Sequence, residues 1–286
     1  MKPPMLIDAH AHLTVNDPAY PVSPPFREVR DPMTAERLLA ALDEHGLAAA
    51  VAVQRAHVFG YDNSYVVDSA ARHPDRLAAM CVVDAQAPDA EATVRRWAGR
   101  GAVAMRLTAP GGNQHGGPGG ADWFASPSSR RIWRLAADLG LSMCLHLYRW
   151  NRDECLRALP GVVRAFPGTP VVLDHVASVE ADRPEPYPGA SELLPLTDLA
   201  DVYIKVTTLN YARMPAAGVN PADVVTWLVS RFGAARVLWG SDVTQTPVSY
   251  PDMIRIAHES VSTLTPQDAA LVLGGTAARL YGLAPA

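Results

Sequence analysis

Short apolar runs alternate with longer amphipathic stretches along the whole chain. The runs have the length and composition of buried strands, and the stretches between them have the periodicity of helices. This alternation predicts βαβ units and a parallel sheet. The eight predicted strands are Met5–Leu13, Ala48–Gln54, Leu77–Asp84, Ala102–Thr108, Leu141–Tyr148, Val171–Ala177, Val202–Thr208 and Val237–Thr244.

The helical stretches follow the strands in regular order. Several begin with a capping residue before a proline, such as Asn220-Pro221 and Thr265-Pro266, which is typical of a helix start. Eight strand–helix units favour a closed α/β fold, the (β/α)8 TIM barrel, and the 286 residues suit one such barrel of roughly 250 residues. We therefore expect residues 1–286 to form a single domain. The predicted helices cover residues 34–45, 63–73, 88–99, 127–139, 154–165, 191–200, 221–232, 250–262 and 266–281.

Composition narrows the choice of partners. Hydrophobic residues make up 49% of the chain and charged residues 19%, which is typical of a globular protein. The net charge of −4 offers no basic field for nucleic acid, and no apolar run approaches the ~18 residues of a membrane span. The first residues show no secretion signal, and the three cysteines are scattered. We expect a cytoplasmic protein that acts on a small molecule, and a homo-oligomer is compatible with the sequence.

Polar residues recur on the strand face expected to line the barrel. In the fourth strand Arg106 lies opposite to Met105 and Leu107, and in the seventh Lys205 lies opposite to Ile204 and Val206, because successive side chains point to opposite faces. Extended to all strands, this alternation predicts a ring of polar side chains at the carboxyl ends. The ring contains His10, His12, Gln54, Asp84, Arg106, His146, His175, Lys205 and Asp242.

Several imidazoles and a carboxylate in this ring suit zinc or another borderline divalent metal. His10 and His12 are two residues apart and share one face of the first strand, as chelation of one ion requires. Each residue also has an ordinary alternative. His146 and His175 could be core histidines, and Asp242 could cap a helix. Their occurrence together at consecutive strand ends favours a site.

Four segments, at residues 7–13, 173–175, 238–242 and 275–281, carry recognisable motifs. They resemble the amidohydrolase superfamily, specifically the amidohydrolase-2 group of TIM-barrel hydrolases and decarboxylases. A further segment, Val53-Gln54 followed by residues 60–65, resembles the branch that holds sugar lactonases and 2-pyrone-4,6-dicarboxylate lactonase. The resemblance spans nearly the whole chain. The four segments are Ile7-Asp8-Ala9-His10-Ala11-His12-Leu13, Leu173-Asp174-His175, Leu238-Trp239-Gly240-Ser241-Asp242 and Gly275-Thr276-Ala277-Ala278-Arg279-Leu280-Tyr281.

The resemblance implies a metal-dependent enzyme, but the sequence departs from the family's motifs at several positions. Arg106 stands where dinuclear members place a bridging lysine or glutamate, which indicates at most one metal ion. Residues 175–178 and 241–246 differ from the motifs usual at the substrate rim, which leaves the substrate open. Some members of this branch work without a metal, so a metal-free site remains an alternative.

On this basis we expect one divalent ion, with Zn²⁺ as the expected metal, held by His10, His12, His146 and Asp242. Asp242 would also accept the proton of the attacking water, and His175 would orient that water or stabilise the oxyanion.

Four further residues are expected to bind the substrate. Arg106 and Lys205 would hold a substrate carboxylate. The alternative for both is a buried ion pair with Asp84 or Asp242. Gln54 and Tyr148 are also expected at the substrate.

The sequence thus predicts a hydrolase that opens a carboxylate-bearing cyclic ester with a metal-activated water. The alternative is a metal-dependent decarboxylase of an aromatic or unsaturated acid, and a third possibility is a barrel that binds a ligand without catalysis. Gln54 and the segment 60–65 favour the hydrolase.

Overall fold

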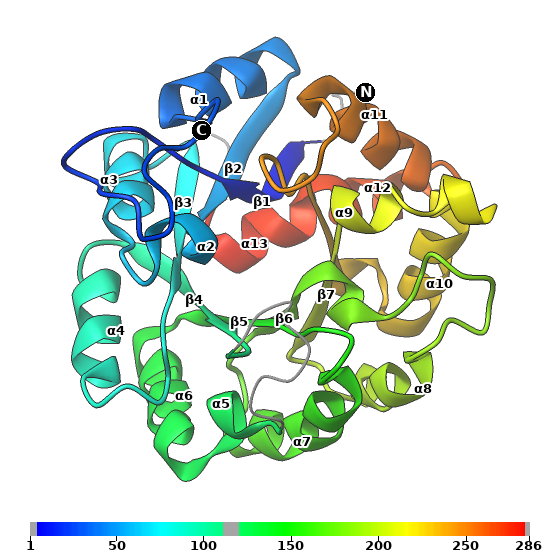
Figure 1. Cartoon of the computed structure of the whole chain (residues 1–286). Coiled ribbons are helices and arrows are strands. Elements are labelled where there is room, and N and C mark those ends of the chain that lie inside the picture. The colour runs from blue at the N-terminus through cyan, green and yellow to red at the C-terminus, as the bar shows by residue number, and fades with distance from the viewer. Residues whose placement is uncertain (1–4, 111–119, 284–286) are drawn as a thin grey trace.

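Eight parallel strands form one sheet in sequential order from β1 to β8 (Figure 1). The computed structural model describes residues 5–110 and 120–283. The sequential order confirms the predicted (β/α)8 barrel. The strands are β1 (Leu6–His12), β2 (Leu47–Val53), β3 (Leu77–Val82), β4 (Ala102–Thr108), β5 (Ser142–His146), β6 (Val171–Leu173), β7 (Val202–Thr207) and β8 (Val237–Gly240).

Helices surround the strands, and α13 lies across the middle of the ring (Figure 1). The α-helices are α1 (Ala35–Glu44), α2 (Ala56–Phe59), α3 (Ser64–Arg72), α4 (Ala90–Ala98), α5 (Asp122–Ala125), α6 (Pro127–Leu139), α7 (Arg152–Ala165), α8 (Ala190–Leu193), α9 (Thr208–Tyr211), α10 (Pro221–Phe232), α11 (Tyr250–Ser260), α12 (Pro266–Ala270) and α13 (Thr276–Tyr281).

The core has two parts, because each strand alternates between the inside of the barrel and the surrounding helices. Ala104, Cys144 and Val172 belong to the inner cluster, which the side chain of Tyr281 from α13 also joins. Met105 and its counterparts on the other strands belong to the outer cluster under the helices. The inner cluster fills the lower barrel, so the polar strand ends lie above a packed floor.

The seam between β8 and β1 closes the barrel with few main-chain contacts. An isolated parallel bridge joins Ala11 to Val243, and the amide of Asp242 donates to the carbonyl of His10 at 2.8 Å. A Cβ atom at Gly240 would lie 2.5 Å from the Cβ of His10. Only glycine therefore allows β8 to approach the first strand this closely.

Four predicted strands end too late: the third and fifth by two residues, and the sixth and eighth by four. The sixth ends at Leu173 rather than at Ala177, because His175, Val176 and Ala177 adopt left-handed φ values of 51°, 54° and 52°. The eighth ends at Gly240 rather than at Thr244, and Asp242 has a φ of 57°. Left-handed conformations are costly for residues other than glycine and are often found at functional sites.

Two predicted helices are also broken. The helix expected over 191–200 is divided into α8 and a 3₁₀ turn (η2, Leu194–Asp198). Pro195 is the second residue of that turn and lacks the amide hydrogen that a continuous helix would use. The helix expected over 266–281 is interrupted by a wide turn (η5, Leu271–Gly275), where a Cβ at Gly274 would lie 2.2 Å from the carbonyl oxygen of Met5.

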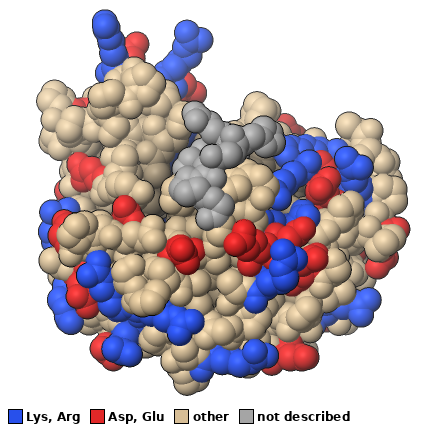
Figure 2. All heavy atoms as spheres, turned by 60° about the horizontal axis from the view of Figure 1, so that its bottom comes forward, with Lys and Arg blue, Asp and Glu red and all other residues tan. Residues whose placement is uncertain are grey.

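None of the helices among the described residues is long and apolar enough to cross a membrane. On the face drawn in Figure 2, basic and acidic side chains are interspersed. This mixture agrees with the small net charge of the chain.

We predict that Gly240→Ala lowers the free energy of unfolding by about 1–3 kcal/mol, because the added methyl group must displace His10 at the seam. Denaturant unfolding measures the change. Gly161→Ala in α7 is the control, since nothing lies within 4 Å of a Cβ there and alanine favours a helix. Equal stability of the Gly240→Ala variant and the wild type would show that the seam tolerates a wider separation.

Candidate functional site

Three buried side chains from the two ends of the chain converge at the seam. The Nε2 atoms of His10 and His12 are 3.3 Å apart. The Oδ1 atom of Asp242 lies 3.6 Å from the first of these nitrogens and 3.3 Å from the second. All three residues are at most 4% exposed. They form one candidate metal-binding group.

Local irregularities bring these side chains together. The pairing of β1 with β2 shifts between Asp8 and Ala11. Ile7 and Ala9 belong to the inner cluster before the shift. Because of the shift, His10 does not point to the opposite face from Ala9, as strict alternation would require. On the other side of the seam, the left-handed conformation of Asp242 turns its carboxylate toward the two imidazoles.

Hydrogen bonds to His12 and Asp242 determine which of their side-chain atoms remain available to bind a metal ion. The Nδ1 atom of His12 lies 2.9 Å from the carbonyl oxygen of Val53, which only accepts, so Nδ1 carries the proton and Nε2 keeps its lone pair. Asp242 receives a hydrogen bond from Thr246 on Oδ2, whereas its buried Oδ1 has no hydrogen-bond partner among the described residues. Burial acts to raise the pKa of Asp242, but the nearby imidazoles of His175, His10 and His12 lower it.

His10 has a choice of tautomer. Its Nδ1 lies 3.4 Å from Oδ1 of Asp174 and 3.3 Å from Nζ of Lys205. If Nδ1 donates to Asp174, Nε2 offers a lone pair. If Nδ1 accepts from Lys205, Nε2 carries a proton toward His12. Burial lowers the pKa of His10 well below its usual value, which favours the neutral imidazole that a metal ion requires.

The first group fits a small divalent cation. Tetrahedral zinc with bonds of about 2.0–2.1 Å has ligand atoms about 3.3–3.4 Å apart, and the three separations in the first group are 3.3, 3.3 and 3.6 Å. The Oδ1 atom of Asp242, which has no hydrogen-bond partner in residues 5–110 and 120–283, is free to bind such a cation.

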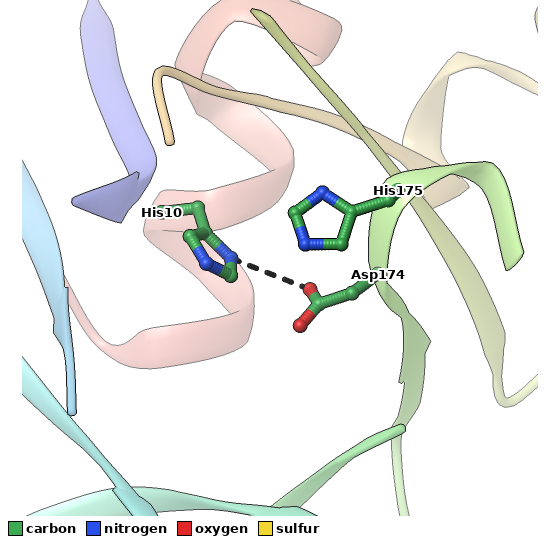
Figure 3. Close-up of side chains that lie close together, drawn as sticks. All are labelled: His10, Asp174 and His175. Atoms are coloured by element: carbon green, nitrogen blue, oxygen red, sulfur yellow. Dashed lines mark ion pairs between the residues drawn. The ribbon is translucent and has the colours of Figure 1, made fainter. Parts of the chain in front are cut away.

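A second group, His10, Asp174 and His175, shares one imidazole with the first (Figure 3). Its cation is already supplied by the chain, because the Lys205 ammonium lies 2.9 Å from Oδ1 of Asp174. The geometry therefore favours one metal position rather than two.

Asp174 is the centre of a buried ion cluster. The Nε atom of Arg106 lies 2.7 Å from its Oδ2, and Lys205 is bound on Oδ1. Burial alone would raise the pKa of Asp174, but these two cations hold it well below its usual value. The predicted ion-pair alternative for Arg106 and Lys205 is thus found, with Asp174 as the partner in place of Asp84 or Asp242.

His175 is held by a chain of hydrogen bonds from β7. The Oδ1 atom of Asn210 accepts from the amide of Thr207 at 3.1 Å and from its hydroxyl at 3.2 Å. Because that hydroxyl proton is used, the 2.7 Å contact between Thr207 Oγ1 and His175 Nδ1 must be donated by the imidazole. His175 therefore presents Nε2 as an acceptor.

The remaining predicted residues lie around this centre without joining it. His146 belongs to neither metal-binding group, and its ring centroid is 5.0 Å from that of His175. Tyr148 contacts the hydroxyl of Thr108 at 3.3 Å. Gln54 donates from Nε2 to the carbonyls of residues 60 and 62, while its buried Oε1 has no partner among the described residues.

Asp84 does not belong to the inward ring, and that prediction is wrong. β3 ends at Val82, so the alternation does not continue to residue 84. Asp84 is exposed and accepts from the amide of Gln86 at 2.9 Å.

The sequence reasoning missed two buried carboxylates. Asp174 follows the inward-facing Val172 by two residues, so strict alternation along the sixth strand would have placed it inside. Asp8 accepts hydrogen bonds from the main chain of His10 and Ser241. No sequence signal reveals the second of these contacts, because it crosses the seam.

The chain belongs to the amidohydrolase family. The family described as Amidohydrolase matches residues 7–283, which includes every residue of the candidate site. No curated protein shows significant similarity to the chain.

Solved structures show the same fold at low sequence identity. One from Acinetobacter baumannii, described as a probable 2-pyrone-4,6-dicarboxylic acid hydrolase with citric acid bound, has 22% identity and a TM-score of 0.76, covering 97% of this chain and 99% of its own. A zinc-bound amidohydrolase from Burkholderia multivorans has 17% identity and a TM-score of 0.74, covering 98% and 100%. A 2,6-dihydroxybenzoate decarboxylase from Rhizobium has 15% identity and a TM-score of 0.67, covering 99% of each chain.

We predict that Asp174→Asn lowers the free energy of unfolding by about 3–5 kcal/mol, because it leaves the buried Arg106 and Lys205 without an anion. Denaturant unfolding at neutral pH measures the loss. Asp31→Asn is the matched control, since the Asp31–Arg37 pair is exposed and such pairs contribute about 0–1 kcal/mol. Equal effects of the two substitutions would contradict the assignment of the buried cluster.

Proposed function

We propose that this chain is a hydrolase that opens a cyclic ester bearing a carboxylate. The proposal is carried by one observation: buried His10, His12 and Asp242 converge on a point where Oδ1 of Asp242 has no hydrogen-bond partner in the described part of the chain. Membership of the amidohydrolase family supports hydrolytic chemistry at such a point.

We propose that His10, His12 and Asp242 hold one divalent metal ion, with Zn²⁺ as the expected metal. The separations between their ligand atoms support this assignment. His146 remains the fourth ligand proposed from the sequence. When bound, the ion would lower the pKa of a water molecule toward ~7 and polarise the ester carbonyl.

Asp242 has a carboxylate suited to moving the proton. Its lowered pKa keeps it ionised, so it can accept a proton as the water oxygen attacks the carbonyl carbon of the ester. The bond from that carbon to the ring oxygen then breaks, and Asp242 returns the proton to the departing oxygen. One water is consumed, and the product carries a new carboxyl group and a new hydroxyl group.

His175 is proposed to orient the water. Its Nδ1 proton is committed to Thr207, so Nε2 can accept the second hydrogen of the water. This tautomer favours the orienting role over oxyanion stabilisation, which would require a donor.

Arg106 is proposed to bind the substrate carboxylate. Its Nε atom is used on Asp174, and within the described part of the chain its terminal nitrogens make no other hydrogen bond. Lys205 is fully buried, and its ammonium pairs with Asp174 at 2.9 Å. We therefore propose that Lys205 neutralises the charge of Asp174 and does not contact the substrate. Gln54 and Tyr148 remain proposed substrate contacts.

The substrate class to assay first is a carboxylated pyrone or sugar lactone. The Acinetobacter protein of the same fold is described as acting on 2-pyrone-4,6-dicarboxylic acid, which is a carboxylated cyclic ester. A cytoplasmic location is proposed as well, which agrees with three buried cysteines that are all free.

A decarboxylase is the second candidate, because a 2,6-dihydroxybenzoate decarboxylase shares the fold. The two reactions give different products. A substrate panel that releases acid without CO₂ supports hydrolysis, whereas release of CO₂ from an aromatic acid supports the decarboxylase.

We predict that Asp242→Asn lowers kcat for lactone opening by at least about 100-fold, since the amide cannot accept the proton. A pH-stat assay on the accepted lactone measures the loss. Asp268→Asn, at the exposed start of α12, is the control and should match the wild type. Hydrolysis by Asp242→Asn at the wild-type rate would remove the proposed base.

We predict that Arg106→Lys raises KM for a carboxylated lactone about 10-fold and leaves KM for a neutral lactone within about twofold. Lysine keeps a charge beside Asp174 but loses the second edge of the guanidinium, which binds carboxylates in a bidentate manner. Steady-state kinetics on the pair of substrates separate the two effects. Equal increases for both lactones would rule out the carboxylate contact.

A further inference from the structure

Asp8 is a fully buried carboxylate that the proposed reaction does not use. Its Oδ1 accepts from the amide of Ser241 at 2.8 Å and from the amide of His10 at 3.0 Å. Its Oδ2 accepts from the hydroxyl of Tyr250 at 3.0 Å. One side chain therefore touches β1, the turn after β8 and the first turn of α11.

We propose that Asp8 is the positioning residue of the metal centre: it fixes the main chain of His10 and of the Ser241–Asp242 turn in one arrangement. This inference rests on the proposed function, because it assigns Asp8 to the same His10, His12 and Asp242 centre.

The need for such a residue follows from the seam. The β1–β8 junction has one isolated bridge, whereas β1 pairs with β2, and β7 with β8, over several residues. Asp242 must hold a left-handed conformation that its own residue type does not favour strongly. The Asp8 carboxylate supplies the acceptor that a longer strand would have provided to Ser241.

The contacts also predict which property of Asp8 matters. All three donors are uncharged groups, so the geometry calls for acceptor atoms rather than a negative charge. Asparagine keeps the oxygen for the two amides, and its NH₂ group can donate to the oxygen of Tyr250. Alanine leaves two buried amides without an acceptor, which is costly.

The test is the affinity of the full chain for Zn²⁺, measured by competition with a chromophoric chelator. We expect Asp8→Ala to weaken binding about 10–100-fold, as loss of a group supporting metal ligands does, and Asp8→Asn to bind within about threefold of the wild type. Tyr250→Phe should also stay within about threefold, because both amides keep Oδ1.

Two controls separate positioning from general damage. Asn63→Ala removes a fully buried hydrogen-bonding side chain that binds the main chain of Val82, away from the seam. Tyr211→Phe removes a buried hydroxyl that contacts Ser260. Both should lower thermal stability without changing zinc affinity. If Asp8→Ala does not fold, Asp8→Ser takes its place. We expect weaker zinc binding there too, because the shorter serine side chain cannot accept hydrogen bonds from both amides.

The outcomes decide between the hypotheses. Wild-type affinity in Asp8→Ala, or equal losses in Asp8→Ala and Asp8→Asn, would overturn the positioning role. Absence of zinc binding by the wild type would instead overturn the proposed metal centre. Crystal structures then test Asp8 alone: the 3.6 Å separation between His10 Nε2 and Asp242 Oδ1 should change by more than about 1 Å in Asp8→Ala and persist in Asp8→Asn. An unchanged separation in Asp8→Ala would contradict the inference.

Discussion

Two buried hydrogen-bond acceptors face each other in this site with no donor between them, and this arrangement constrains everything around it. His12 Nε2 and Asp242 Oδ1 are 3.3 Å apart, and the proton of His12 is committed to the carbonyl of Val53. Such a pair is unfavourable in a buried environment unless a cation or a proton lies between them. His10 can complete the set in the tautomer that donates to Asp174. The structure around these atoms is therefore best understood as support for a bound cation.

Charge compensation explains why one such position is favoured over two. His10 faces two carboxylates, one on each side of its ring. On the Asp174 side, the chain itself supplies Lys205 and Arg106. On the Asp242 side, no lysine or arginine of the described residues forms an ion pair with the carboxylate. The same imidazole thus connects a neutralised cluster to one that still requires a cation.

Much of the site could be predicted because, in a parallel barrel, the alternation of side chains along each strand determines which of them point into the barrel. The inward placement of Arg106 and Lys205 followed directly from the two-residue period. The sequence analysis named Asp84 or Asp242 as their partner, and charge alone does not distinguish these acids from Asp174, which also follows a strand. The assignment depends on where β3 and β6 stop, and strand ends are set by tertiary contacts rather than by local sequence.

The left-handed turns at His175 and Asp242 are the other limit of sequence reasoning. The segment Val172-Leu173-Asp174-His175-Val176-Ala177 has the composition of a strand, and it contains no glycine or proline that would indicate a turn. The turn is held instead by distant groups, such as Asn210, which donates to the carbonyl of His175. Similarly, Gly240 indicates a close approach but does not identify His10 as the neighbour. Contacts across the seam join residues more than 200 positions apart, and they become visible only in the folded chain.

The most direct measurement is the anomalous density of a crystal grown with one equivalent of Zn²⁺. We expect a single peak about 2.0–2.1 Å from the Nε2 atoms of His10 and His12 and from a carboxylate oxygen of Asp242. A peak between His10 and Asp174, or full occupancy at a place away from these three residues, would contradict this expectation.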